Sequence, residues 1–349
     1  MTLRPLLLLL LLSGPALAAP GEWRARVGLE TGADTNPERL FTTHGGATSP
    51  SAMLSAVGSL DGRLRAGNLS LSGGWDLGLR GFFPDLQAST LVQAARGKLS
   101  LDVGPSFSLV TRVRGKDRRG ADREYSDLQL LGGVAWLPDA QLSVELLALG
   151  SGFAYREDAS LGFVALGGTL NARYRFDRRH SLTLFGEASE RHFDGTRARD
   201  REPAAPGVIG ARRRYDDAML VGASYSYRGP FALTAAYSYA GLDSNSFGET
   251  VQRHRVSVVA GVPLFWDLTL LAQLGLQFAR YPDGIYLSPE LIVLEDDENQ
   301  NSAALKLTRP LGESLDLEVR WSIHQNRLRT NGFDYLRQVG GIGLTWRLR

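Results

Sequence analysis

The chain has 349 residues, with 39 Lys and Arg against 37 Asp and Glu, and therefore a formal net charge of +2. This near balance gives no bulk attraction to nucleic acid, so no nucleic-acid partner is expected. Cysteine is absent and glycine is frequent, at 40 residues. A chain without cysteine cannot be held together by disulfides, and it can cross an oxidising compartment unfolded without mispairing.

Residues 1–18 have the three parts of a secretory signal peptide. Arg4 is the charged start, Leu6–Leu12 is the apolar run, and Ala16-Leu17-Ala18 is a small-x-small cleavage site. The apolar run is too short to cross a bilayer as a helix. No cysteine follows it, which excludes a lipid-anchored lipoprotein. We therefore expect a signal peptide over 1–18, cleaved near Ala18, and one exported domain over 19–349.

The segment after the signal alternates apolar and polar residues. Trp23, Ala25, Val27 and Leu29 share one face of an extended strand, and Arg24, Arg26, Gly28 and Glu30 share the other. Similar runs continue to the end of the chain, and no stretch of 18 apolar residues occurs that could be a membrane helix. A closed barrel is the β-structure whose backbone is satisfied in lipid. The pattern predicts an all-β fold, a transmembrane antiparallel up-and-down β-barrel of about 16 strands, in a bacterial outer membrane.

The connections between these runs alternate in length. Short turns are expected at 65–68, 103–105, 137–139, 177–179, 228–230, 265–267 and 311–313. Longer polar loops lie between them: Asp34–Ser51, Gly115–Glu124, Asp194–Arg214, Leu242–Thr250, Pro282–Asn301 and Gln325–Asp334, with more modest loops at Phe83–Gln87 and Arg156–Ser160. Outer-membrane barrels have short periplasmic turns and longer external loops. A soluble β-sandwich or propeller, the alternative fold, has no reason to sort its connections in this way.

Aromatic residues agree with this orientation. With the apolar face of each strand toward lipid, the residues nearest the periplasmic turns include Trp23, Phe107, Trp136, Tyr174, Phe176, Tyr225, Tyr227, Phe231, Trp266 and Trp346. Indole and phenol rings prefer the headgroup level of a membrane. A weaker group, Phe83, Tyr239 and Phe278, is expected near the external ends.

The predicted lumen face is basic near the periplasmic turns. Its basic residues are Arg24, Arg26, Arg63, Arg65, Arg96, Lys98, Arg173, Arg175, Lys306 and Arg347, answered in part by Asp61, Asp102, Asp316 and Glu318. Positive charge at a narrow mouth concentrates anions. One interpretation is a vestibule for phosphorylated or acidic solutes, or for acidic polysaccharide. The other is that the basic side chains pair with lumen carboxylates or bind periplasmic partner proteins.

Two predicted external loops have unusual composition. The 282–301 loop contains apolar residues such as Tyr286 and Leu291, followed by an acidic run that includes Asp296, Asp297 and Glu298. It either folds inward and constricts the pore or forms a hairpin above the membrane. The acidic run lacks the spacing of a calcium loop, so no metal site and no cofactor are predicted. The arginines of the Asp194–Arg214 loop either bind lipopolysaccharide phosphates or are simply solvated.

Catalysis is not expected. Ser322 and His324 form a Ser/His pair on one face of a strand. Barrel lipid hydrolases use such a pair at the lipid-facing surface, with a polar or acidic orienting group. Here Trp321 and Ile323 occupy the lipid side, so the pair faces the lumen, and the chain is predicted not to be an enzyme.

Across residues 19–349 the chain resembles the bacterial outer-membrane β-barrel (porin-like) superfamily. Gly32–Pro37 is similar to a Gly-x-Asp-Ser-Asn-Pro element that opens barrels of surface-assembly and polysaccharide-export proteins, and a partial copy occurs at Gly241–Asn245. A turn started by Asp and Asn is a sufficient explanation for both copies. The chain ends on Arg349, whereas such barrels usually end on an aromatic residue that the barrel insertion machinery reads.

Two functions follow from this resemblance and from the alternating pattern. The first is a pore that passes hydrophilic, and in particular anionic, solutes across the outer membrane. The alternative is an outer-membrane component of an envelope-spanning machine for polysaccharide export, surface assembly or motility. The partners expected in either case are outer-membrane lipid and lipopolysaccharide.

Overall fold

The computed structural model describes residues 21–37, 42–43, 48–120, 124–195, 213–246, 248–282, 301–328 and 333–348. The strands are β1 (Glu22–Asp34), β2 (Thr42–Thr43), β3 (Ser51–Ala66), β4 (Leu69–Phe83), β5 (Thr90–Asp102), β6 (Phe107–Arg119), β7 (Tyr125–Trp136), β8 (Leu142–Tyr155), β9 (Phe163–Arg175), β10 (His180–Phe193), β11 (Tyr215–Arg228), β12 (Ala232–Ser244), β13 (Val251–Pro263), β14 (Thr269–Arg280), β15 (Asn301–Pro310), β16 (Leu315–Leu328) and β17 (Phe333–Leu348). Two short 3-10 turns, η2 (Leu86–Ala88) and η3 (Ala159–Leu161), follow β4 and β8. None of the described residues belongs to a helix long and apolar enough to span a membrane.

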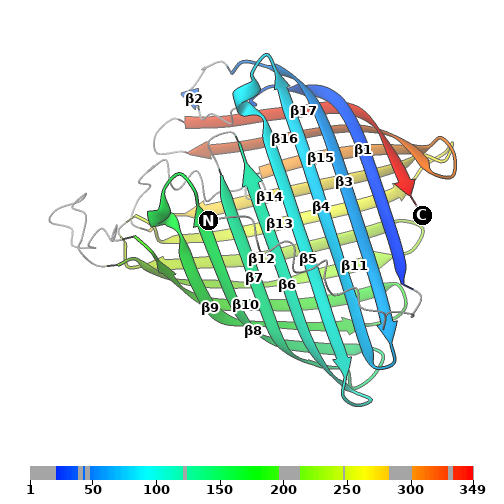
Figure 1. The fold of residues 1–349 in the computed structure, drawn as a ribbon, viewed down its shortest axis with the longest axis vertical. Helices are drawn as coiled ribbons and strands as arrows, with labels where there is room; N and C mark the ends of the chain where they lie inside the picture. The colour runs from blue at the N-terminus through cyan, green and yellow to red at the C-terminus, as the bar shows by residue number, and fades with distance from the viewer. Residues whose placement is uncertain are drawn as a thin grey trace, which may run out of the picture.

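The sixteen long strands form a closed barrel. Each pairs antiparallel with its neighbours in the chain, and β17 pairs back onto β1, from Ala25 opposite Leu348 to Asp34 opposite Val339. The two-residue strand β2 adds only a short pairing to the start of β17. Figure 1 shows the long strands tilted and side by side in one continuous wall. The predicted all-β antiparallel barrel of about 16 strands is confirmed.

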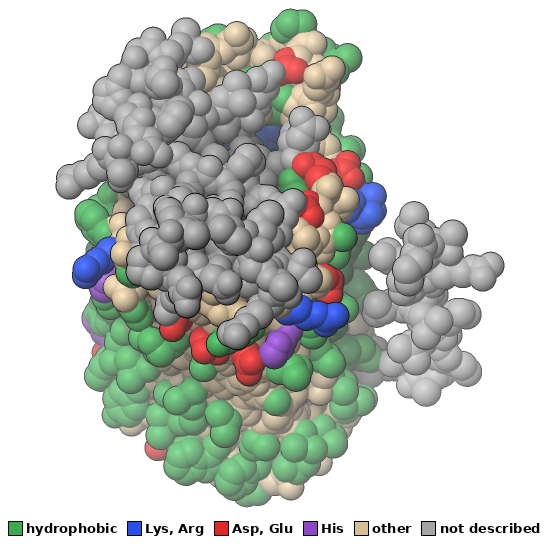
Figure 2. Space-filling model, turned by 90° about the vertical axis from the view of Figure 1, so that its left-hand side faces the viewer, with side chains coloured by type: hydrophobic (Ala, Val, Ile, Leu, Met, Phe, Trp, Pro, Cys, Tyr) green, Lys and Arg blue, Asp and Glu red, His purple; other side chains and the backbone are tan. Residues whose placement is uncertain are grey.

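The register assigns every described strand residue to one face of the wall, because directly opposed residues in neighbouring strands point to the same side. The outward positions carry large apolar side chains that remain exposed, such as Leu146 at 65% and Leu166 at 66%. Hydrophobic side chains cover much of the outer wall seen in Figure 2. Soluble monomers do not expose a continuous apolar belt of this kind, whereas a membrane barrel presents one to lipid. The barrel is therefore a transmembrane barrel.

Connections sort by length between the two ends of the barrel. The short turns, from 67–68 to 311–314, lie at the end where β1 begins and β17 ends, which we call the short-turn end. The β3–β4 turn is only Gly67-Asn68, and Gly67 has a φ of +57°, a conformation that glycine adopts without strain. Most connections at the opposite, long-loop end are longer, as the sequence predicts, whereas the β6–β7 and β16–β17 connections have only five and four residues.

Three predicted loops begin too early in the chain, among them Leu242–Thr250, because β12 continues to Ser244. Residues 115–119 belong to β6 rather than to a Gly115–Glu124 loop, and β16 runs on to Leu328 within the predicted Gln325–Asp334 loop. The ladder of β6 and β7 continues to Arg118 opposite Tyr125. Because these extensions are polar, their sequence does not distinguish a paired strand above the lipid from an unpaired loop.

The aromatic girdle lies at the short-turn end. Trp23, Phe107, Trp136, Tyr174, Phe176, Tyr225, Phe231, Trp266 and Trp346 are exposed there, at 36–76%. Tyr227 is half-buried, with its ring 4.9 Å from that of Phe231. Trp23 lies across Gly62 of the neighbouring strand, where a Cβ atom would approach the indole to 2.3 Å. A bare backbone at this position is what lets the indole lie flat on the wall.

Candidate pore-lining site

The register places all ten basic residues predicted for the lumen face on the inward face toward the short-turn end, with Lys306 opposite Arg320. Arg24 is opposite Asp61, Arg26 is opposite Ser59 and Arg347, Arg63 and Lys98 are opposite Ser72, Arg65 is opposite Ser70, Arg96 is opposite Gly74, Arg173 is opposite Thr183, and Arg175 is opposite Ser181. Those that share a strand are two positions apart in the sequence, and residues i and i+2 of a strand point to the same side.

Part of the ring is neutralised by carboxylates. Arg96 binds Asp61 through Nη2 and Asp76 through Nη1, both at 2.5 Å. The Nζ atom of Lys98 lies 3.8 Å from Glu145 Oε1, and Arg347 Nη2 lies 3.0 Å from Asp316 Oδ1. Lys306 Nζ lies 2.7 Å from Glu318 Oε1. The interpretation that the basic residues pair with lumen carboxylates therefore holds for Arg96, Lys98, Lys306 and Arg347.

The remaining members have no such partner. Within the described ranges no carboxylate lies within ion-pair distance of Arg24, Arg26, Arg63, Arg65, Arg173 or Arg175. A charge that faces a confined lumen without a counter-ion raises the local concentration of mobile anions. The inner wall at the short-turn end thus carries an excess of positive charge that its own carboxylates leave uncompensated.

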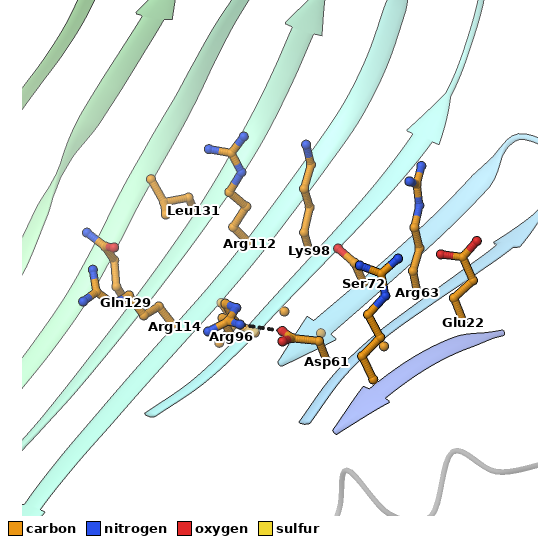
Figure 3. A pocket seen from close by; sticks show the side chains of 15 residues that line it. Glu22, Asp61, Arg63, Ser72, Arg96, Lys98, Arg112, Arg114, Gln129 and Leu131 are labelled. Carbon is orange, nitrogen blue, oxygen red and sulfur yellow. Dashed lines mark hydrogen bonds and ion pairs between the residues drawn. The ribbon is translucent and has the colours of Figure 1, made fainter. Parts of the chain in front are cut away.

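Arg24 and Arg63 border a cavity of about 670 Å³ on the inner wall of β1–β7. Its charged lining residues are Glu22, Arg24, Asp61, Arg63, Arg96, Lys98, Arg112 and Arg114. Figure 3 shows Arg63, Lys98 and Arg112 extending in the same direction, while Arg96 turns aside to Asp61. Arg112 in turn binds Glu145, with Nη2 2.5 Å from Oε2. Strands β3, β5 and β6 therefore present cationic side chains to one water-accessible space.

Sequence reasoning missed Arg112 and Arg114. Both alternate correctly with the outward Val113 and fall on the inward face of β6, where Arg112 is opposite Lys98 and Arg114 is opposite Arg96. This alternation could have assigned both residues to the lumen. They were missed because they lie in the middle of a strand, whereas the prediction considered residues beside the turns. It also missed Arg178, Arg179 and Arg228, which line a second cavity at the short-turn end.

One sector of the inner wall is apolar. Val110, Leu131, Ala135, Leu147 and Leu149 form a cluster on the inward face of β6, β7 and β8, each 2–9% exposed. The sequence did not predict this patch, because a leucine in an alternating run reads equally well as inward or outward. The water-accessible part of the lumen is therefore lined unequally around the barrel.

A row of aromatic rings crosses four strands on the inward face near the long-loop end. Tyr125, Phe153, Phe163 and Phe193 have successive ring-centroid distances of 5.5, 5.3 and 5.1 Å. The guanidinium of Arg214 lies 4.2 Å from the Phe193 ring. Aromatic pairs and cation–π contacts of this kind each add stability beyond the area they bury. The row ties β7, β8, β9 and β10 together at this rim.

The aspartates of the two copies of the loop-opening element, Asp34 and Asp243, lie on different faces of the wall. In the first, Asp34 faces inward and binds Arg337 of β17, with Nη2 2.6 Å from Oδ2. In the second, Asp243 faces outward opposite Asp217, and it is the next residue, Ser244, that faces inward. The Ser244 hydroxyl donates to Asp216, which binds Arg214. The copies are thus shifted by one residue, which exchanges the faces of the barrel.

Several sequence predictions lie outside the described residues. These are the signal peptide over 1–18, most of the Asp194–Arg214 loop, and the loop residues Tyr286, Leu291, Asp296, Asp297 and Glu298. Ser322 and His324 do lie on the inward face, opposite Val339 and Arg337, as predicted. Across the described part of the chain, no three His, Asp or Glu side chains converge to hold a metal ion.

No protein-family model and no curated protein matches the chain. Solved structures similar to it are outer-membrane β-barrel proteins. OccAB1 of Acinetobacter baumannii has 11% identity and a TM-score of 0.49, with 94% of this chain and 99% of that chain covered. A bacterial polysaccharide outer-membrane secretin has 7% identity and a TM-score of 0.46, covering 94% and 98%. The siderophore receptor PirA of Pseudomonas aeruginosa has 10% identity and a TM-score of 0.43, covering 95% and 81%. Likeness at this level carries no conclusion about cargo.

Proposed function

We propose that this outer-membrane β-barrel is a water-filled pore for hydrophilic solutes, with a preference for anions. A barrel of sixteen strands is wide enough to enclose an aqueous channel. The strands described here close without a gap, and their inward positions are largely polar. The outer belt anchors the wall in lipid and leaves the lumen as the route across the membrane.

The preference for anions rests on one observation, the uncompensated arginines of the inner wall. Arg24 and Arg63 border the cavity of about 670 Å³, and no carboxylate of the described chain pairs with either. Cationic side chains at a confined mouth lower the energy of an entering anion and raise that of a cation. Phosphorylated solutes and carboxylates gain most, because arginine binds both through forked hydrogen bonds.

Reversal potentials in a salt gradient test the proposal. The protein in planar bilayers should give discrete conductance steps and a reversal potential displaced toward that of chloride. The double variant Arg24→Glu/Arg63→Glu should move the reversal potential toward that of potassium, because it replaces two lumen cations by anions. Arg309→Glu is the matched control, since Arg309 faces outward opposite Leu317 and should leave selectivity unchanged.

Two results would contradict this proposal at different points. A cation-selective wild-type pore would end the anion preference and leave the pore itself intact. Absence of any conductance would end the pore and favour the alternative, a barrel that acts as the outer-membrane component of an envelope-spanning machine.

A further inference from the structure

A second basic cavity lies at the short-turn end, on the hairpins between β8 and β11. It has a volume of about 610 Å³ and is formed by the β9–β10 turn, the end of β11 and the start of β8. Five arginines line it, namely Arg173, Arg175, Arg178, Arg179 and Arg228. Its acidic lining residue is Asp177. We call this group of five the arginine pocket.

The arginines of this pocket are not neutralised by the described chain. None of the five has an ion pair there, and four of them, all except Arg173, are exposed. Arg173 donates from Nη2 to the Ser181 hydroxyl at 3.3 Å, while its buried Nε has no hydrogen-bond partner. Arg96, by contrast, binds two aspartates.

Asp177 offsets only one of the five positive charges, and its carboxylate lies within ion-pair distance of none of the five arginines. Its Oδ1 accepts the backbone N–H groups of Arg179 and His180 at 2.6 and 2.8 Å. These hydrogen bonds hold the pKa of Asp177 below its usual value, so the group is ionised at neutral pH. It fixes the turn, and the guanidinium groups beside it remain available.

The lipid headgroups are an unsuitable partner for the pocket, because aromatic rings occupy the outward side of the same hairpins. Tyr174 and Phe176 meet edge to face at 5.1 Å, and Tyr227 and Phe231 are 4.9 Å apart. His180 Nδ1 is 2.6 Å from the Tyr225 hydroxyl, which continues this outer row. Arg173, Arg175 and Arg228 lie on the inward face of their strands. The pocket therefore opens away from the bilayer.

We propose that the arginine pocket is a docking site for an acidic segment of a periplasmic protein. Five guanidinium groups spread over two hairpins match a row of carboxylates, whereas a small anion neutralises only one or two of them. Clusters of arginine recognise acidic peptide motifs in this way, and their charge also speeds encounter. This site is distinct from the cavity assigned to solute passage, and it would bring a partner to the rim of the pore.

Binding of an oligoglutamate peptide to the purified barrel in detergent tests the proposal. Fluorescence anisotropy of the labelled peptide should report saturable binding that weakens as salt is added. Arg178→Glu/Arg179→Glu should reduce affinity by about tenfold or more, because two attractive contacts become repulsive. Arg178→Gln/Arg179→Gln should cause a smaller loss in the same direction. Arg309→Glu, outside the pocket, should bind as the wild type does.

Tryptophan fluorescence of each preparation is the control for folding, and single-channel conductance separates this site from the pore. Retained conductance with lost peptide binding supports a docking site, and peptide binding without any conductance supports it while refuting the pore. Equal peptide binding by wild type and the double glutamate variant would overturn the proposal. Competition by inorganic phosphate at the same total charge as the peptide would also overturn it, and would identify a small-anion site.

Discussion

The buried ion pair between Asp34 and Arg337 should be the most sensitive point of barrel closure. It joins the last residue of β1 to β17, and the side chains are 0% and 2% exposed. Arg337 donates Nε to both carboxylate oxygens, at 3.1 and 3.0 Å, and Nη2 to Oδ2 at 2.6 Å. Removing one partner of such a pair leaves a buried charge without its counter-ion, which costs about 3–5 kcal/mol.

We expect Asp34→Ala and Arg337→Met each to lower the free energy of unfolding by that amount. The double variant Asp34→Ala/Arg337→Met should recover most of it, because it removes both charges and leaves neither buried without a counter-ion. Arg96→Met is the control, since Arg96 and its partners are more than 40% exposed. Exposed pairs contribute about 0–1 kcal/mol.

The assay is urea unfolding of the barrel in lipid vesicles, followed by tryptophan fluorescence, with refolding checked for reversibility. The complete double-mutant cycle gives the coupling energy of the pair. A cost for Asp34→Ala no larger than that for Arg96→Met would refute the reasoning, and so would a double variant that is destabilised by the sum of both single changes.

Three further outcomes are expected. The folded-state pKa of Asp177 is below its usual 3.8. The stabilisation of the turn by this carboxylate is therefore complete above pH 3.8 and is lost as the pH falls through the lower folded pKa. A carboxyl-carbon NMR titration with a midpoint at or above 3.8 would contradict this. Phe163→Ala should cost about 2–3 kcal/mol in urea unfolding, below the range for a fully buried ring because Phe163 is half-buried, and a cost near zero would show that the aromatic row adds nothing. Gly62→Leu should displace the Trp23 indole and shift its fluorine NMR signal in fluorotryptophan-labelled protein. Gly58→Leu should not shift this signal, because no heavy atom lies within 4 Å of a Cβ added at Gly58. Equal shifts in the two variants would contradict the packing of Trp23 on Gly62.

The fold could be predicted from the sequence because its two signals are local. Alternation in β1 assigns Val27 to lipid and Arg26 to the lumen, and the sorted connections assign the two ends of the barrel. No long-range information is needed for either, since the first depends on a period of two along one strand and the second on the lengths of successive connections.

The chemistry of the inner wall could not be read in the same way. Arg96 finds Asp61 across two ladders, and only the register of both ladders brings the side chains together. The inward position of Leu147 was hidden because Leu146 precedes it and either could have faced the lipid. Which arginines remain unpaired is therefore a tertiary property.

The most direct test of the account is the face on which consecutive residues of one strand lie. The chain has no cysteine, so single cysteines can carry nitroxide labels without background. On β13, positions 256 and 258 point outward and positions 257 and 259 inward, although residue 259 is a valine. In proteoliposomes we expect labels at Val256 and Val258 to be relaxed by oxygen dissolved in lipid, and labels at Ser257 and Val259 by a water-soluble nickel chelate. Relaxation by oxygen at Val259, or by the chelate at all four positions, would contradict a sealed wall between lipid and water.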